Sequence, residues 1–165
     1  MKKFKFNPKL LTGFFDEKIR ENCKSCKRYG KKATCPPNVD SIKYYRTLLP
    51  RYSHGILLVE KFIIDDLANW IKLGTNSSLT IHKELLKIRK QLLQEGKFAL
   101  IFGAGSCKNC TNCSFPCKFP EKSVIPVEGT GIDVVEMVDC ITKIKIAFPV
   151  EKQNYFYRIG VVLYD

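Results

Sequence analysis

The chain has 165 residues, 45% of them hydrophobic, with only ten glycines and eight prolines. This length suits one domain and the composition excludes a disordered or fibrous protein, so we expect a single domain over residues 1–165. Lysine and arginine outnumber aspartate and glutamate by 28 to 16, which gives a formal net charge of +12.

The first third of the chain combines an irregular lead-in with one strand signal. Residues 1–22 are predicted to be irregular or partly helical, and residues 23–37 to form a loop rich in cysteine, lysine, glycine and proline. Asp40 can cap a short helix that runs to about Leu49, where a proline follows. The aliphatic segment 54–62 predicts a buried strand.

The middle of the chain carries helical patterns followed by a second strand. A helix over 65–73 is predicted to end at Gly74, and residues 75–78 to form a polar turn. Residues 97–102 predict a second buried strand that leads directly into a group of cysteines. Between them, residues 79–95 predict a helix whose hydrophobic residues recur along one face, at Ile81, Leu85, Ile88 and Leu92.

The last third of the chain predicts one helix and two strands. Residues 118–130 form a loop with two prolines, and residues 133–143 a helix. Residues 144–150 and 155–164 are predicted as antiparallel strands because their connection is short. This order of elements indicates an α/β protein, with α+β as the alternative: a mixed β-sheet with packed helices and two cysteine-rich metal-binding loops at one end.

The cellular compartment bears on the role of the cysteines. Residues 1–8 are basic but lack the apolar stretch of a signal peptide. The longest apolar runs, 55–59 and 98–102, have the length of strands and fall far short of a membrane span. We therefore expect a cytoplasmic protein without a membrane partner. In that reducing compartment the eight cysteines indicate metal or redox chemistry instead of disulfides.

The strongly basic charge has two interpretations. It is typical of a lysine-rich solvated surface, and also of an electropositive face that docks nucleic acid or an acidic protein partner. The basic residues are spread along the chain without the interleaved aromatic residues of a single-strand-binding surface, so the charge alone does not indicate nucleic-acid binding. Two tetrathiolate-bound 4Fe–4S centres would reduce the charge from +12 to about +8.

A dense run of four cysteines follows the second predicted strand. Its C-x2-C-x2-C-x3-C spacing is that of bacterial ferredoxins, although no proline follows the fourth cysteine directly. Gly103 and Gly105, just before the run, permit close approach of backbone N–H groups to a cluster. Zinc is the main competitor, because paired C-x2-C units also form structural zinc sites. The four candidate ligands are Cys107, Cys110, Cys113 and Cys117.

A second group of candidate ligands, Cys23, Cys26 and Cys35, has C-x2-C-x8-C spacing and is followed by two prolines. In two-cluster ferredoxins the fourth cysteine of the run serves the other cluster, so Cys117 can complete this trio. Alternatively the quartet forms one complete site and the trio leaves one iron open. Cys140 lies in the middle of a predicted helix, where the role of a small buried hydrophobic residue is favoured over that of a ligand.

Other chemically capable residues have weaker patterns. His54 and His82 are far apart in sequence and are expected to be structural or at the surface. Glu128 and Asp133 flank a Gly-Thr-Gly segment, where loop and capping roles are favoured over acid–base chemistry. The residues therefore identify no catalytic group, and the sequence leaves open whether the protein is an enzyme.

Taken together, the motifs resemble the DUF2284 family of predicted metal-binding, cysteine-rich proteins of archaea and anaerobic bacteria, over most of the chain. The resemblance implies a cysteine-bound metal centre of the iron–sulfur kind, held by the seven motif cysteines, and brings no established reaction with it. Cys140 is not part of the family's pattern. The segments that carry the resemblance are 23–37, 103–117, Pro120-Glu121-Lys122 and 128–134.

Three functions are compatible with these motifs. The favoured one is a small iron–sulfur protein, with one or two 4Fe–4S clusters, that transfers electrons or serves a redox partner whose acidic face docks on the basic surface. The second is an enzyme that uses an open-iron, three-cysteine cluster for sulfur transfer or related chemistry. The third is a zinc-stabilised binding module, and the positive net charge makes RNA a candidate for what it binds.

Overall fold

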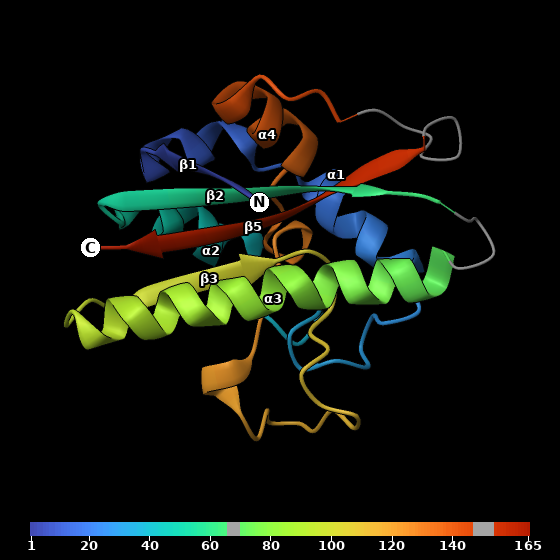
Figure 1. Ribbon diagram of the computed structural model, residues 1–165. Coiled ribbons are helices and arrows are strands. Elements are labelled where there is room, and N and C mark those ends of the chain that lie inside the picture. The colour runs from blue at the N-terminus through green and yellow to red at the C-terminus, as the bar shows by residue number, and fades with distance from the viewer. Residues whose placement is uncertain (66–69, 147–153) are drawn as a thin grey trace.

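A mixed five-stranded β-sheet lies at the centre of the computed structural model, which describes residues 1–65, 70–146 and 154–165. The strands are ordered β1-β2-β5-β3-β4 across the sheet, and Figure 1 labels the first four of them. β3 and β4 run parallel, whereas the other neighbouring strands are antiparallel, which confirms the predicted mixed sheet. The strands are β1 (Lys2–Phe6), β2 (His54–Ile63), β3 (Ala99–Gly103), β4 (Ile125–Pro126) and β5 (Tyr155–Tyr164).

The two long strands, β2 and β5, pair over their whole length in the middle of the sheet. Their antiparallel register runs from His54 opposite Tyr164 to Ile63 opposite Tyr155. Successive side chains point to opposite faces, so Leu57 belongs to the core on one face and Leu58 to the core on the other. The strands predicted at 54–62 and 155–164 are confirmed.

The N-terminal strand β1 corrects the expectation of an irregular or partly helical segment at residues 2–6, whereas the helices η1 (Pro8–Phe14) and α1 (Glu17–Glu21) agree with it. Lys2–Phe6 pairs antiparallel with β2 at the edge of the sheet. Phe4 and Phe6 pack against the core, while the lysine between them stays exposed. This alternation is a period-two strand signal, and pairing with the long β2 stabilises a segment that is too short to fold alone.

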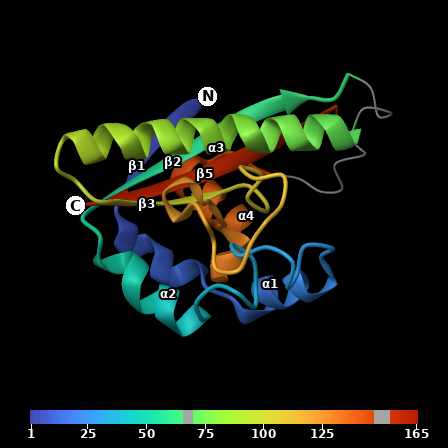
Figure 2. The same ribbon diagram turned by 90° about the horizontal axis from the view of Figure 1, so that it is seen from below.

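A long helix, α3 (Trp70–Gln94), covers one face of the sheet (Figures 1 and 2). Its C-terminal end precedes Gly96, whose φ of +74° favours glycine. No helix within the described ranges is both long and apolar enough to cross a membrane. The predicted apolar face is confirmed, because its four residues are buried against the sheet: Ile81, Leu85, Ile88 and Leu92.

The start of α3 differs from the prediction. The sequence predicts an end at Gly74 and a polar turn over 75–78, but the helix runs through both. The hydroxyls of Ser77 and Ser78 donate to the Gly74 carbonyl at 3.2 and 3.0 Å, so these polar residues are satisfied inside the helix. Positions 66–69 of the predicted helix over 65–73 lie outside the described residues.

Short helices cover the opposite face of the sheet (Figure 2). The core between them and the strands includes Leu11, Tyr45, Leu49 and Met137, each at most 3% exposed. The helix predicted from Asp40 begins one residue later, because Ser41 is the cap and accepts from the Tyr44 N–H at 3.2 Å. These helices are η1 (Pro8–Phe14), α2 (Ile42–Leu48), η3 (Leu49–Arg51) and α4 (Val134–Thr142).

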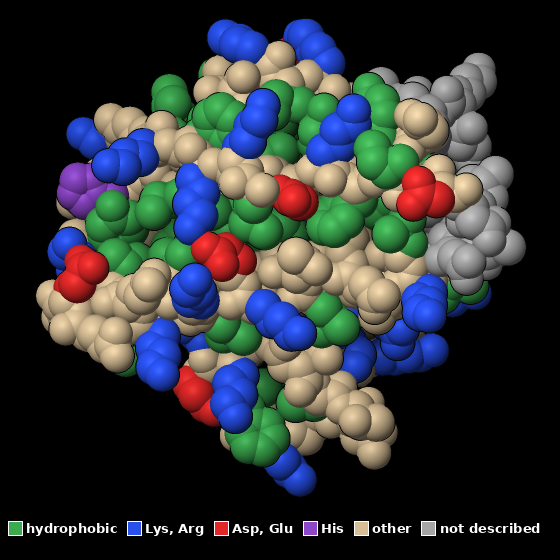
Figure 3. Space-filling model, in the orientation of Figure 1, with side chains coloured by type: hydrophobic (Ala, Val, Ile, Leu, Met, Phe, Trp, Pro, Cys, Tyr) green, Lys and Arg blue, Asp and Glu red, His purple; other side chains and the backbone are tan. Residues whose placement is uncertain are grey.

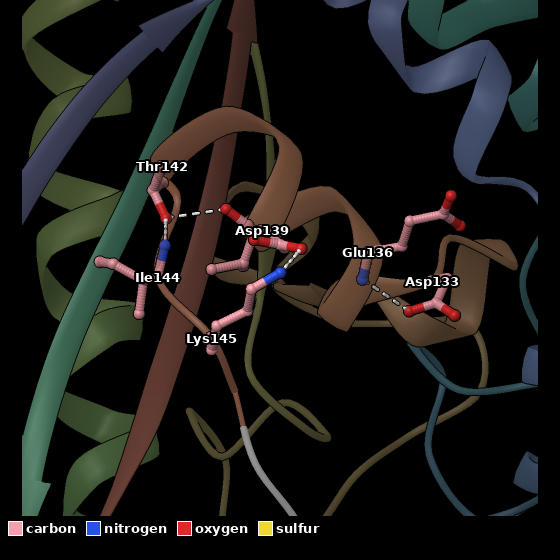
Figure 4. Close-up of polar contacts among 7 residues, drawn as sticks. Asp133, Glu136, Asp139, Thr142, Ile144 and Lys145 are labelled. Atoms are coloured by element: carbon pink, nitrogen blue, oxygen red, sulfur yellow. Dashed lines mark hydrogen bonds and ion pairs between the residues drawn. The ribbon is translucent and has the colours of Figure 1, made fainter.

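The helix α4 confirms the prediction over 133–143 (Figure 4). The Asp133 carboxylate caps it by accepting from the Glu136 N–H at 3.0 Å, and Lys143 ends it in a left-handed conformation with φ +62°. Residues 144–146 of the strand predicted over 144–150 are not in a strand, and the remaining four lie outside the described residues.

Candidate metal centre

Two cysteine-rich loops that are far apart in the sequence lie near each other below the sheet in the view of Figure 1. The first cysteine loop, residues 23–37, begins in the 3₁₀ helix η2 (Asn22–Ser25), which follows α1 (Glu17–Glu21). The second cysteine loop, residues 104–118, follows directly from β3. It leads to the 3₁₀ helix η5 (Pro120–Lys122).

A backbone N–H group of the first loop donates to a cysteine sulfur of the second loop. The Ala33 nitrogen lies 3.3 Å from Cys113 Sγ, although the two residues are 80 positions apart. Within the first loop, the Arg28 N–H donates to Cys26 Sγ at 3.5 Å. Hydrogen bonds to cysteine sulfur stabilise negative charge on it and tune the potential of a bound iron–sulfur cluster. Each loop therefore has one sulfur that already receives such a bond.

The first loop is folded back on itself by backbone hydrogen bonds. The Cys26 N–H donates to the Cys23 carbonyl at 3.0 Å, and the Gly30 N–H donates to the Pro36 carbonyl at 2.9 Å. Gly30 has a φ of +67°, which a residue with a side chain rarely adopts. This closure returns Cys35 to the neighbourhood of Cys23 and Cys26.

Cys35 is the most enclosed of the candidate ligands, at 6% exposure. Burial raises the pKa of its thiol to about 11, and negative charge on Cys26, Cys23 and Cys107 acts in the same direction. The influence of Cys107 means that the first cysteine of the second loop lies close to Cys35. Burial likewise raises the pKa of the Cys23 thiol, followed by the negative charge of Glu128. A bound cation reverses these effects, because metal ligation requires the thiolate.

The loops gather the predicted ligands without closing them around a single point. As placed, the part of the chain that the structure describes contains no group of three His, Cys, Asp or Glu side chains that could hold a metal ion. All eight cysteines are free of disulfides. By its donor chemistry, a set of soft sulfur ligands on two neighbouring loops fits an iron–sulfur cluster or zinc, and not magnesium or calcium.

The surroundings of the individual cysteines differ. Cys107 lies near Cys35, and Cys113 contacts the first loop. Cys110 and Cys117 are half-buried and make no hydrogen bond to the first loop within the described residues. Cys140 is exposed on α4, which packs on η1 and β1, so the expectation of a buried hydrophobic role for it is wrong.

Basic side chains surround the two loops. The first loop contains five lysines and arginines, the second contains two, and neither contains an acidic residue. Burial lowers the pKa of Lys108, and the positive charges of Arg28, Arg158 and Lys32 lower it further. None of these four cationic side chains forms an ion pair with another described residue. The face in Figure 3 is likewise richer in basic than in acidic side chains. The cysteines therefore lie in an electropositive environment that favours an anionic ligand set.

His82 lies directly behind the start of the second loop. It is fully buried, and a Cβ atom on Gly103 would stand 2.8 Å from its ring. Burial lowers the pKa of His82 to about 4; the Ala104 backbone opposes this shift, and the positive charges of Lys108 and Arg158 reinforce it. Neither ring nitrogen makes a well-oriented hydrogen bond within the described residues. The sequence-based expectation of a structural histidine stays compatible with this position.

Two further charged residues, Glu128 and Arg158, lie beside the loops and are not among the predicted site residues. Glu128 is in the 3₁₀ helix η6 (Glu128–Thr130), and Arg158 is in β5. Glu128 acts electrostatically on Cys23, and Arg158 acts on both Glu128 and Lys108. An arginine within a strand of largely buried residues is the sequence signal for Arg158. The sequence signal for Glu128 is its place before the Gly-Thr-Gly segment, which favours a loop or capping role.

The described geometry agrees with the one comparison that gave a match. A family model described as "Predicted metal-binding protein (DUF2284)" matches residues 12–164. The matched range includes both cysteine loops, Glu128 and Arg158. No curated protein and no solved structure showed significant similarity to the chain.

Proposed function

Because the chain belongs to the DUF2284 family of predicted metal-binding proteins, we propose that it binds iron–sulfur clusters of the 4Fe–4S kind and acts in electron transfer. The observation that carries this proposal is the contact between the loops: the ferredoxin-spaced second loop lies against the three-cysteine first loop, joined by the bond from Ala33 to Cys113. The residues that would hold the clusters are Cys23, Cys26, Cys35, Cys107, Cys110, Cys113 and Cys117.

The cysteine spacing favours iron–sulfur over zinc. Successive x2 spacings followed by an x3 spacing suit a cubane cluster, whose irons are bound by thiolates that approach from several directions. The N–H groups of Ala33 and Arg28 donate to cysteine sulfurs, which would stabilise the thiolates of a cluster and would equally stabilise those of a zinc site. When bound, a 4Fe–4S cluster supplies reversible one-electron chemistry.

The surface around the loops suits an acidic protein partner. Lys27, Lys31 and Lys118 are exposed, and the two loops contain no acidic residue to offset them. Phe115 and Phe119 of the neighbouring segment expose 53% and 46% of their surface, Lys118 lies next to Phe119 in the sequence, and the Lys122 ammonium lies over the Phe119 ring. Exposed apolar residues together with basic ones are typical of a transient docking site, and complementary charge accelerates association. The proposed partner is therefore a redox protein with an acidic face.

A metal and sulfide analysis tests this function. The full-length chain is purified without oxygen, and iron, zinc and acid-labile sulfide are measured per chain, together with the EPR spectrum after reduction. We expect iron and sulfide in equal amounts, a brown colour, and a reversible signal from the reduced cluster. A colourless protein that contains zinc and no sulfide would contradict the proposal and favour a zinc-stabilised binding module instead.

A further inference from the structure

A cavity of about 400 Å³ lies beside β3, on the side away from β5. Its walls come from the C-terminal part of α3, from β3, and from residues 120–125, which include η5 and the start of β4. In Figure 1, β3 is the lowest of the labelled strands, and η5, in orange, lies below it. The volume is within the range of small-molecule sites, roughly 300–1,000 Å³. Because β3 leads into the second cysteine loop and η5 follows it, the cavity lies between the two segments that flank this loop.

Most of the cavity wall is apolar. Ala99, Ile101 and Phe102 are at most 5% exposed and form its floor. Leu93 and Phe98 also line it, yet they expose 66% and 67% of their surface and so form its rim. Two large apolar side chains that are left exposed around an apolar floor indicate a ligand with an apolar body.

The edge of β3 argues against a peptide strand as the occupant. β4 pairs only with Phe102 and Gly103, which leaves the earlier part of β3 without a strand partner on this side among the described residues. The Gly103 carbonyl accepts from the Val127 N–H, so by alternation the backbone groups of Ile101 and Ala99 face the same edge. Both residues are nearly fully buried, and a peptide backbone cannot reach them. The cavity therefore suits a compact molecule.

The Arg89 guanidinium is a charged group on the cavity wall that has no acceptor. Arg89 is half-buried and lies one turn before Leu93 on the same face of α3. No hydrogen bond or ion pair joins its side chain to another described residue. Glu121 also lines the cavity, but it is exposed, so water weakens its attraction for Arg89. A partly desolvated guanidinium of this kind matches an anionic group, and carboxylates accept two parallel N–H bonds from arginine.

The cavity matches a single negative charge on its ligand. Lys97 also lines it, but the Lys97 ammonium is already paired with the Glu95 carboxylate at 2.9 Å. Arg89 is therefore the cation that remains available among the described lining residues. A carboxylate carries one negative charge and suits one guanidinium, whereas a phosphate group carries close to two and is bound by several donors.

A second copy of the chain is a poorer occupant than a small anion. In a two-fold symmetric dimer the same patch of both chains meets face to face. The Arg89 side chains of the two copies would then lie opposite each other, between chains that each have a formal net charge of +12. Like charges across an interface oppose association.

We propose that this cavity binds a small organic monocarboxylate, whose carboxylate accepts hydrogen bonds from the Arg89 guanidinium and whose aliphatic or aromatic body packs between Leu93, Phe98 and β3. The inference is independent of the metal that the two cysteine loops bind, because no cysteine is among the residues that line the cavity. A bound ligand contacts both β3 and η5, so it lies at the base of the second cysteine loop.

Calorimetric titration of the full-length protein, purified without oxygen, tests this site. The probes are hydrocinnamate as the aromatic acid, octanoate as the aliphatic acid, and hydrocinnamamide as the matched neutral compound. We expect one binding site per chain for at least one acid, and at least about tenfold weaker binding of the amide, because a charge-assisted bond is lost. Arg89→Met, which keeps an apolar stem, should weaken the acid by a similar factor. Arg51→Met, at an exposed arginine of η3, is the control and should leave the affinity unchanged.

Several results would overturn the proposal. Neither acid binding at concentrations up to about 10 mM would do so, as would equal affinities for hydrocinnamate and its amide. Several acid molecules per chain, with the same affinity in Arg89→Met, would indicate adsorption to the basic surface. A dimer that dissociates on Phe98→Ala, without acid binding, would show that a second copy covers the cavity. If Arg89→Met fails to fold, the comparison of acid and amide on the unaltered chain decides.

Discussion

The backbone N–H of Ala33 donates to the sulfur of Cys113 at 3.3 Å, and this bond joins two loops that are 80 residues apart in sequence. The sequence does not predict this bond, because the spacing of the cysteines identifies each loop only as a separate group of ligands. The bond makes the second loop part of the environment of the first. A change at either residue should therefore affect the metal centre of the other loop.

The first prediction compares two cysteines. Cys113→Ser removes a ligand and the acceptor of the Ala33 N–H, so we expect a loss of about half of the iron and sulfide per chain. Cys140→Ser changes an exposed thiol on α4 and should leave both contents unchanged. The measurement is iron and sulfide after oxygen-free purification. Equal losses in the two variants would contradict the ligand assignment.

The second prediction concerns the tight packing at Gly103. A Cβ atom there would stand 2.6 Å from Cγ1 of Val124 and 2.8 Å from the His82 ring, so Gly103→Ala must relieve a clash with both side chains. We expect a loss of about 1–3 kcal/mol in the free energy of unfolding, and a lower cluster content because the second loop starts here. Gly13→Ala, where nothing lies within 4 Å, is the control for chemical denaturation. Similar losses of unfolding free energy in Gly103→Ala and Gly13→Ala would contradict the steric explanation.

The third prediction is a pH dependence of stability from His82. Burial lowers its pKa from 6.5 to about 4 in the folded state, so between these values the unfolded chain binds the proton more tightly. The free energy of unfolding should therefore fall as the pH drops from about 6.5 to about 4, by roughly 3 kcal/mol from this residue. His82→Leu should remove this component in denaturation experiments at several pH values. His54→Gln, at an exposed histidine, should retain it.

The fourth prediction tests the docking surface. Reversing two exposed charges in the first loop, with Lys27→Glu and Lys31→Glu, should slow electron transfer from an acidic plant-type ferredoxin by about tenfold at low salt. The difference should shrink as salt is added, because exposed charges are screened. The control variant carries Lys87→Glu and Lys90→Glu, at two exposed positions on α3, and so has the same net charge as the test variant. Equal slowing in both variants would indicate a general charge effect without a defined docking face.

The elements that the sequence predicts well are those with a local, periodic signal. The buried face of α3, the strands β2 and β5, and the Asp133 cap of α4 each follow from residues within one turn or one strand. The errors fall where a tertiary contact overrides a local preference. At Gly74 the helix continues. The Ser77 and Ser78 hydroxyls donate to the Gly74 carbonyl, and Arg158 of β5 donates to the same carbonyl and to Ser77 Oγ. At Lys2–Phe6, pairing with β2 organises a short segment.

The candidate site also combines residues that the sequence predicts with residues that only the fold brings close. The seven cysteines of the two groups are visible in the sequence because their spacing is short and specific. The neighbours that complete their environment come from elsewhere in the chain: His82 from α3, Glu128 from η6 and Arg158 from β5. None of these has a spacing relationship to the cysteines, and only the packing of η6 against both loops brings Glu128 into their vicinity.

The position of β5 in the chain has a consequence for biosynthesis. This strand contributes Arg158 and pairs with both β2 and β3, yet it follows every cysteine in the sequence. While the chain is still on the ribosome, the thiols of the first loop have emerged, but the sheet that positions the second loop has no central strand. The second loop therefore gains its complete sheet neighbourhood only after β5 has been synthesised and has left the ribosome, and a metal site built on both loops can close only from that point on.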